Sequence, residues 1–123
     1  MTQPVGPGTF RKLADAAESG TLYLEPGAAD TCVAACDRFI EALQHLQGTC
    51  ENLEVSEAFG HLPSARALGL KFDAKATGPG GLFEVLQTHI DTVAAMRAMF
   101  AAAGKAYLDT DAETRESLRR ATT

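Results

Sequence analysis

The sequence predicts an all-α fold in which two long antiparallel helical arms form a hairpin, with a short helix at each end. Composition is the first reason: the 123 residues are 46% apolar, contain no Trp and only six Phe and two Tyr, and are rich in Ala. Such residues favour helices that pack closely face to face. Periodicity is the second reason, since apolar positions recur at steps of four and three residues along both predicted arms.

The expected domain has three parts. Residues 1–25 hold a flexible lead and a short helix, residues 26–107 form the hairpin with a turn near 55–63, and residues 108–123 form a C-terminal tail. A cluster of Gly and Pro at 77–81 is either a loop or a helix kink.

The N-terminal part is predicted from its capping residues. Thr9 can cap a helix over Phe10–Ser19, which Gly20 would end in a left-handed conformation. An extended connector over Thr21–Glu25 follows. Pro26 then suits the first position of the next helix, where its missing N–H costs nothing.

The first arm is expected from Pro26 to about Glu54, with one polar residue, Gln47, in its seam. Asp37 is placed on the side opposite the apolar stripe. Residues that widen the stripe on one flank are Phe39, Leu46 and Leu53. The seam itself consists of Ala29, Val33, Cys36, Ile40, Leu43, Gln47 and Cys50.

The turn between the arms is predicted at Gly60, His61, Leu62 and Pro63, with Gly as a stop and Pro as a restart. Beyond this turn, apolar positions continue to recur at steps of four and three residues from Ser64 through the cluster at 77–81. Preserved phase slightly favours one kinked arm to Tyr107, whereas matching arm lengths favour a loop. The second seam consists of Phe83, Leu86, Ile90, Val93, Arg97, Phe100, Gly104 and Tyr107.

Both stripes are wider than the two-position seam of a lone hairpin, so we expect a partner to complete a four-helix bundle. The alternative is a self-sufficient monomer of three or four helices. The residues predicted to form the interface are Val33, Ile40, Leu43, Ile90, Val93 and Phe100.

Charge and hydropathy argue against other partners. The formal net charge is −5, and the only cationic cluster, Arg115, Arg119 and Arg120, is interleaved with Glu, so nucleic-acid binding is not expected. No apolar run approaches the roughly 20 residues that a membrane span requires. Met1–Gly8 does not resemble a signal peptide, so export would need another route.

The reactive side chains do not predict catalysis or a cofactor. Cys32, Cys36 and Cys50 share one helix face and are expected to be reduced core residues. No His stands at a spacing that completes a metal site or an acid–base pair, and no phosphate loop is present.

A Tyr-x-x-x-Asp motif, Tyr107 to Asp111, stands where the second arm is expected to end. At this spacing the aromatic ring and the carboxylate share a helix face that a receptor can contact. The structural interpretation is a Tyr that ends the seam beside a capping acid. Thr110 and Glu113 form a possible capping box for a last short helix to about Arg120.

These features together resemble the helical hairpins associated with type VII (ESX) secretion. The resemblance covers the heptad first arm, the Gly/His/Pro turn, the long second arm, Tyr107 with Asp111, and the short tail. The turn departs from the Trp-x-Gly of the main family, in which the Trp of one subunit and the signal of the other form a composite export signal. In this chain a partner or Phe59 would have to take the place of the Trp in the composite signal.

The resemblance implies a non-enzymatic type VII secretion substrate or co-secreted targeting partner. It would form a homo- or heterodimer with another helical-hairpin protein or an effector, and the ESX coupling ATPase would recognise its signal. It would be cytoplasmic before export and secreted or at the cell surface afterwards. The alternative is a cytosolic helical adaptor, chaperone or immunity-like protein that binds a partner and is not exported.

Overall fold

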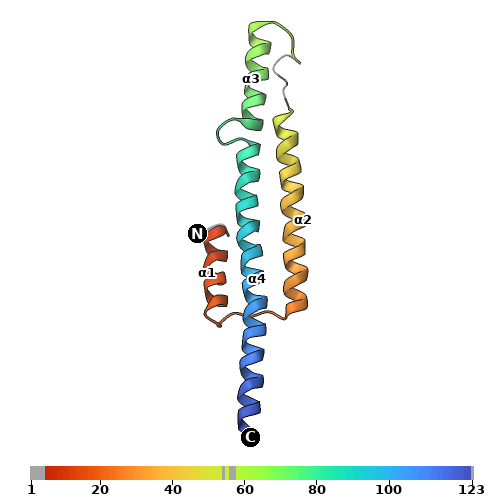
Figure 1. Ribbon diagram of the computed structural model, residues 1–123. Coiled ribbons are helices and arrows are strands. Elements are labelled where there is room, and N and C mark those ends of the chain that lie inside the picture. The colour runs from red at the N-terminus through yellow and green to blue at the C-terminus, as the bar shows by residue number, and fades with distance from the viewer. Residues whose placement is uncertain (1–4, 54, 56–57, 123) are drawn as a thin grey trace. The chain divides into compact units, whose positions relative to one another are not determined.

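The computed structural model describes residues 5–53, 55 and 58–122. These residues form four helices and no strand (Figure 1), which confirms the all-α class. In the described part of the chain no helix is both long and apolar enough to cross a membrane. The helices are α1 (Pro7–Glu18), α2 (Pro26–Glu51), α3 (Pro63–Thr77) and α4 (Leu82–Ala121).

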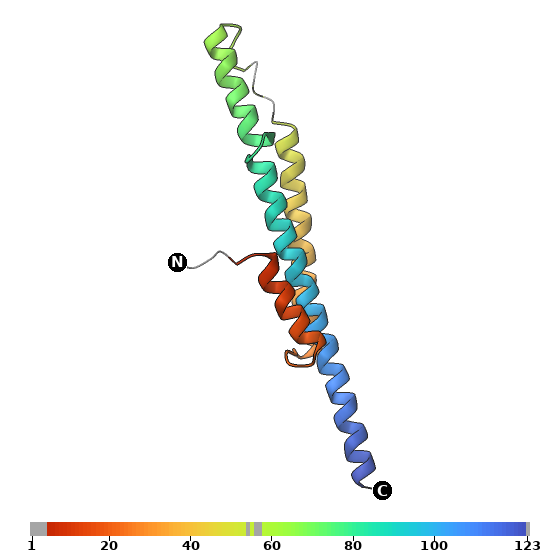
Figure 2. The same ribbon diagram turned by 90° about the vertical axis from the view of Figure 1, so that its left-hand side faces the viewer.

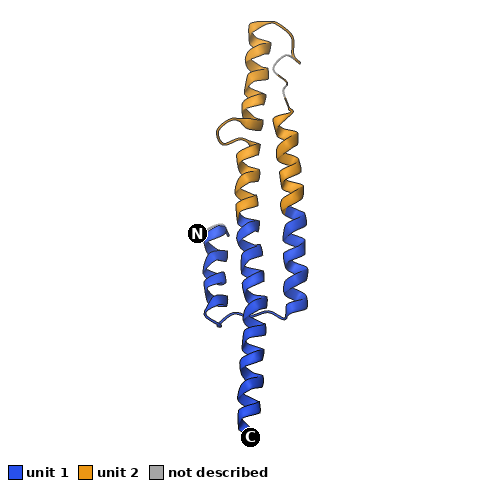
Figure 3. Cartoon of the chain, in the orientation of Figure 1, with its two compact units in different colours: residues 1–39, 92–123 blue, residues 40–91 orange. Residues whose placement is uncertain are grey.

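The chain divides into two compact units (Figure 3). Unit 1 comprises residues 1–39 and 92–123, and therefore contains α1, the first half of α2 and most of α4. Unit 2 comprises residues 40–91, with the rest of α2, all of α3 and the start of α4.

Helix α1 begins earlier than predicted. Gly6 is its N-cap residue and Pro7 its first residue, so the cap predicted at Thr9 is wrong. Pro supplies the helical φ angle without an N–H to satisfy. At the other end Gly20 has φ +83°, the Gly20 N–H donates to the Ala17 carbonyl, and the Thr21 N–H donates to the Ala16 carbonyl. This hydrogen-bond pair closes the helix as its sequence predicts.

The connector after α1 is held at its C-terminal end. The Leu24 N–H donates to the Ala103 carbonyl of α4 at 3.0 Å. The Glu25 carboxylate accepts the N–H groups of Gly27 and Ala28, both at 2.9 Å, and so satisfies two free donors at the start of α2. Pro26 is the first residue of α2, as predicted.

In unit 1, α2 and α4 lie antiparallel and α1 runs beside α4 (Figures 1 and 2). Ala29 near the start of α2 faces Gly104, while Asp37 further along α2 pairs with Arg97, an earlier residue of α4. The buried apolar side chains of this unit are small, apart from Val93 and Met99. They are Ala17, Ala29, Cys36, Val93, Met99, Ala103 and Ala106.

In unit 2 the polar seam residue Gln47 is buried and satisfied. Its Nε2 donates to the Phe83 carbonyl at 3.3 Å and to Gln87 Oε1 at 3.1 Å, which places this end of α2 beside the start of α4. The buried apolar side chains here are Leu43, Cys50, Ala76, Leu86 and Ile90.

The segment between α2 and α3 turns at Gly60, where φ is +99°, and α3 begins at Pro63. The Val55 N–H donates to Asp73 Oδ1 of α3 at 2.8 Å, and the Phe59 and Phe72 rings lie 5.7 Å apart. The predicted end of the first arm, Glu54, lies outside the described residues, and α2 ends at Glu51.

The cluster at 77–81 is a loop, so the slightly favoured single kinked arm is wrong. Helix α3 ends at Thr77 and α4 starts at Leu82. Gly80 adopts φ +72°, and a Cβ at Gly81 would lie 2.7 Å from the Lys75 carbonyl oxygen. Only Gly fits this tight turn, which breaks the helix although the apolar phase continues across it.

The C-terminal restart is also wrong. Helix α4 continues unbroken from Leu82 to Ala121, and within it the Thr114 hydroxyl donates to the Thr110 carbonyl. Thr110 and Glu113 therefore cap no new helix. Ion pairs at spacings of three and four residues support this stretch, among them Lys105–Asp109 and Arg115–Asp111.

Candidate functional site

Tyr107 lies inside α4, which continues to Ala121, so the expectation that the second arm ends near Tyr107 is wrong. Its side chain is half-buried. The Tyr107 ring lies 6.3 Å from the Tyr23 ring of the connector, with the two planes tilted by 56°. Aromatic pairs in this range stabilise by about 0.5–1.5 kcal/mol beyond the area they bury. Tyr107 therefore anchors the connector to α4.

Asp111 lies one turn further along the same helix face. Its carboxylate pairs with the Arg115 guanidinium at 3.1 Å, and its side chain is 42% exposed. An exposed pair of this kind contributes little to stability. The carboxylate oxygens therefore remain available to a receptor that offers an Arg or backbone N–H groups.

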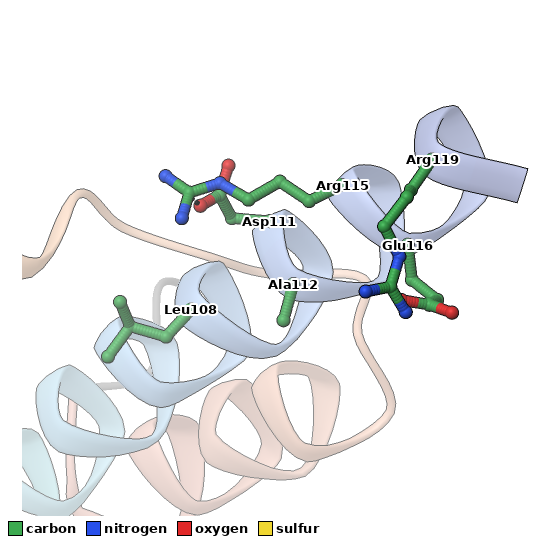
Figure 4. A pocket seen from close by; sticks show the side chains of 6 residues that line it. All are labelled: Leu108, Asp111, Ala112, Arg115, Glu116 and Arg119. Atoms are coloured by element: carbon green, nitrogen blue, oxygen red, sulfur yellow. Dashed lines mark hydrogen bonds and ion pairs between the residues drawn. The ribbon is translucent and has the colours of Figure 1, made fainter. Parts of the chain in front are cut away.

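The motif continues into a longer helical face. Leu108, Asp111, Ala112, Arg115, Glu116 and Arg119 line a surface hollow on α4 (Figure 4). In this view the Arg115 guanidinium lies over the Asp111 carboxylate. Leu108 is 55% exposed and gives this face an apolar contact beside the charged pair. Apolar and charged groups side by side on an exposed helix are groups that a protein partner can contact together.

The six predicted interface residues are packed within the chain itself. Leu43, Ile90 and Val93 are buried, and Val33, Ile40 and Phe100 are half-buried. In this conformation they offer a partner little area. The turn residues differ: His61, Leu62 and Pro63 are exposed and Gly60 is half-buried.

Large apolar side chains are exposed elsewhere, mainly in unit 2. On α2, Phe39 is 53% exposed and Leu46 is 48% exposed. On α4, Leu82 is 49% and Val85 46% exposed. Of these, Phe39 and Leu46 belong to the flank that widens the first seam in the sequence, and this flank was the available signal for exposed apolar side chains.

The cysteines are free thiols of two kinds. Cys36 and Cys50 are buried and Cys32 is half-buried. Burial raises the pKa of the Cys36 thiol, and the neighbouring Cys32 and Asp37 raise it further. A raised pKa disfavours the thiolate, so Cys36 is a poor nucleophile.

Groups that hold metals in other proteins are dispersed here. His45, His61 and His89 are exposed on three different segments. Among the residues that the structure describes, no three His, Cys, Asp or Glu side chains gather where they could hold a metal ion. The exposed face of α4 that includes Asp111 remains as the candidate site.

Comparison with known proteins identifies no relative: no family model, no curated protein and no solved structure matches the chain.

Proposed function

We propose that this chain is a non-enzymatic helical hairpin that binds a protein partner and is exported by a type VII secretion system, with Tyr107 and Asp111 as its export signal. The observation that carries the proposal is their placement on α4. Tyr107 marks the point where α4 contacts the connector, and beyond it every described residue to Thr122 is exposed except the half-buried Asp111 and Glu116. A receptor can therefore reach the ring edge and the carboxylate from one side of one helix.

A preformed helix supports recognition by the coupling ATPase. The pairs Lys105–Asp109, Arg115–Asp111 and Arg119–Glu116 follow the spacing that stabilises isolated helices, by about 0.2–0.5 kcal/mol each. A segment that is already helical does not pay the entropy of ordering when it binds.

Partner binding is supported by the apolar area left exposed in unit 2. Covering such side chains with helices of a second hairpin would complete a four-helix bundle, as a homodimer or a heterodimer. The side chains concerned are Leu46, Leu53, Leu68, Phe72, Leu82 and Val85.

The second candidate is an adaptor, chaperone or immunity-like protein that stays in the cytosol. Two contacts favour it: Tyr107 packs on Tyr23, and Asp111 pairs with Arg115. Both motif residues then serve the fold, and their spacing carries no signal. Partner binding is common to both candidates, so only export separates them.

The test is export from a bacterial strain with a working type VII system, compared with the same strain lacking the coupling ATPase. We expect the tagged chain in the medium of the first strain alone, while a cytosolic marker stays in the cells of both. Equal release by both strains, or retention by both, contradicts the export proposal and leaves the adaptor.

A further inference from the structure

Helix α3 has one exposed face on which apolar and basic side chains alternate. Leu68, Lys71, Phe72 and Lys75 are spaced by three and four residues, so their side chains share one side of the helix. All four are exposed, with Leu68 at 46% and Phe72 at 52%. These four residues are here called the basic face of α3, and all of them lie within unit 2.

The segment that precedes α3 adds a third large apolar side chain. The Phe59 ring lies 5.7 Å from the Phe72 ring, with the two planes tilted by 32°. Although the two rings contact each other, each remains about half exposed. The basic face and Phe59 together therefore present three large apolar groups beside two lysine ammonium groups.

The charges of α3 are divided between two sides of the helix. The helix carries three cations, Arg66, Lys71 and Lys75, and one acid, Asp73. Arg66 and Asp73 are seven residues apart and share the side opposite the basic face. The Asp73 carboxylate there accepts the Val55 N–H at 2.8 Å. Within α3 the basic face thus holds two positive charges and no negative one, in a chain whose net charge is −5.

This combination fits the surface of an anionic membrane. Apolar side chains of a surface helix enter the boundary between headgroups and acyl chains, while long Lys stems keep their ammonium groups at the level of the phosphates. Each Lys near an anionic lipid surface strengthens binding. Lys meets phosphate as a point charge, which requires no fixed geometry of the lipid. Protein interfaces, in contrast, are depleted in Lys. Charge and composition therefore favour lipid over a protein partner.

We propose that the basic face of α3, together with Phe59, docks this chain on an anionic membrane surface. The contact is peripheral: α3 lies in the plane of the headgroups, with Leu68 and Phe72 turned into the lipid. This inference goes beyond the proposed function, because it requires neither export nor a partner hairpin. Exposed apolar side chains of unit 2 that remain for a helical partner include Leu46, Leu53, Leu82 and Val85.

The test is co-sedimentation of the purified full chain with lipid vesicles in low-salt, reducing buffer. One set of vesicles contains equal parts of phosphatidylserine and phosphatidylcholine, and the other contains phosphatidylcholine alone. We expect the wild type to bind the first set and to stay in solution with the second. Added salt should weaken the binding, because it screens the charges. No binding to the anionic vesicles, or equal binding to both sets, overturns the proposal.

Two matched pairs of variants locate the contact. Lys71→Glu should lower the vesicle partition coefficient by at least about tenfold, while Lys12→Glu, the same change at an exposed residue of α1, should lower it by less than about threefold. Leu68→Ser should lower it by about fivefold. Leu70→Ser should leave it nearly unchanged, because Leu70 is exposed on another side of α3. If the two members of each pair bind alike, the basic face is not the contact and the proposal fails.

Two further measurements keep the test decisive. Circular dichroism shows whether each variant keeps its helices, and Lys75→Glu replaces Lys71→Glu if the latter unfolds. Sedimentation equilibrium without vesicles tests a different occupant, a second copy of the chain. If the wild type is a dimer that Leu68→Ser separates and Leu70→Ser does not, the basic face binds protein, which overturns the lipid proposal. Because purified protein and vesicles contain no secretion system, these outcomes are independent of export.

Discussion

Gly104 of α4 lies so close to Ala29 of α2 that a Cβ at position 104 would be 2.7 Å from the Ala29 Cβ. Both residues are buried within unit 1, and the Ala29 Cβ is attached directly to the backbone. It cannot move aside as the end of a long side chain would. The separation of α2 and α4 at this level therefore depends on Gly104.

Gly104→Ala should lower the free energy of unfolding by about 1–3 kcal/mol, because overpacking exceeds the gain of about 1 kcal/mol in helix propensity. Gly48→Ala in α2 is the matched control, since a Cβ there meets no atom within 4 Å. The control should stabilise the protein. Urea unfolding followed by circular dichroism measures both, and a Gly104→Ala variant as stable as Gly48→Ala contradicts the close contact.

Gln47 is 8% exposed and donates to Phe83 and Gln87. Gln47→Ala removes these hydrogen bonds and leaves space, so we expect a loss of about 1–3 kcal/mol. Gln47→Leu should stay within about 1 kcal/mol of wild type, because Leu refills the space and water reaches the exposed Gln87. Gln44→Ala on the exposed face is the control. If Gln47→Ala unfolds at the same urea concentration as Gln44→Ala, the hydrogen bonds of Gln47 to Phe83 and Gln87 do not stabilise the fold.

Hydrogen bonds from the Gly27 and Ala28 N–H groups lower the pKa of the Glu25 carboxyl below its ordinary value of 4.5. A lowered folded-state pKa stabilises the fold above pH 4.5, and this contribution is lost as the pH falls through the folded-state pKa. Glu25→Gln should therefore be less stable than wild type at neutral pH, and the difference should shrink in acid. Thermal unfolding from pH 7 to pH 3 tests this, with Glu113→Gln as an exposed control. If the difference in stability between wild type and Glu25→Gln is constant or grows in acid, the Glu25 carboxylate does not stabilise the start of α2.

Periodicity was sufficient to predict the helical class and most of the buried face of α2. Ala29, Cys36, Leu43 and Cys50 are buried because a heptad track turns one side of a helix toward its neighbour. The end of α1 near Gly20 and the start of α2 at Pro26 were also predicted. Gly can adopt the positive φ that ends a helix, and Pro has a fixed φ that suits the first position of a helix.

The sequence did not predict the helix boundaries where two alternative structures fit the same residues. The track from Phe72 to Phe83 fits both a kinked helix and the observed loop, and only the backbone at Gly80 and Gly81 decides between them. Thr110 and Glu113 match a capping box, yet the surrounding residues also suit a helix interior.

Two side-chain contacts could not be predicted from the spacing of residues in the sequence. Arg97 falls in the second seam and Asp37 on the side opposite the first, yet the two form an ion pair because the long Arg side chain extends past the edge of α4. The contact of Tyr107 with Tyr23 was hidden for a related reason: the extended connector has no periodicity from which its path can be predicted.

The central claim is that Tyr107 and Asp111 are recognised and do not merely support the fold. Two variants separate these roles. Tyr23→Ala removes the same ring contact as Tyr107→Ala but leaves the motif intact. Asp109→Ala removes an exposed carboxylate and its pair with Lys105, as Asp111→Ala removes the pair with Arg115.

The most direct measurement is the ratio of secreted to cell-associated protein for these four variants and wild type, in one strain with a working type VII system. Tyr107→Ala and Asp111→Ala should each lower the ratio by at least about tenfold, while Tyr23→Ala and Asp109→Ala stay within about twofold of wild type. Circular dichroism of the purified variants checks that all four remain helical. If the Tyr107→Ala and Asp111→Ala variants are secreted as well as their controls, the motif is not an export signal.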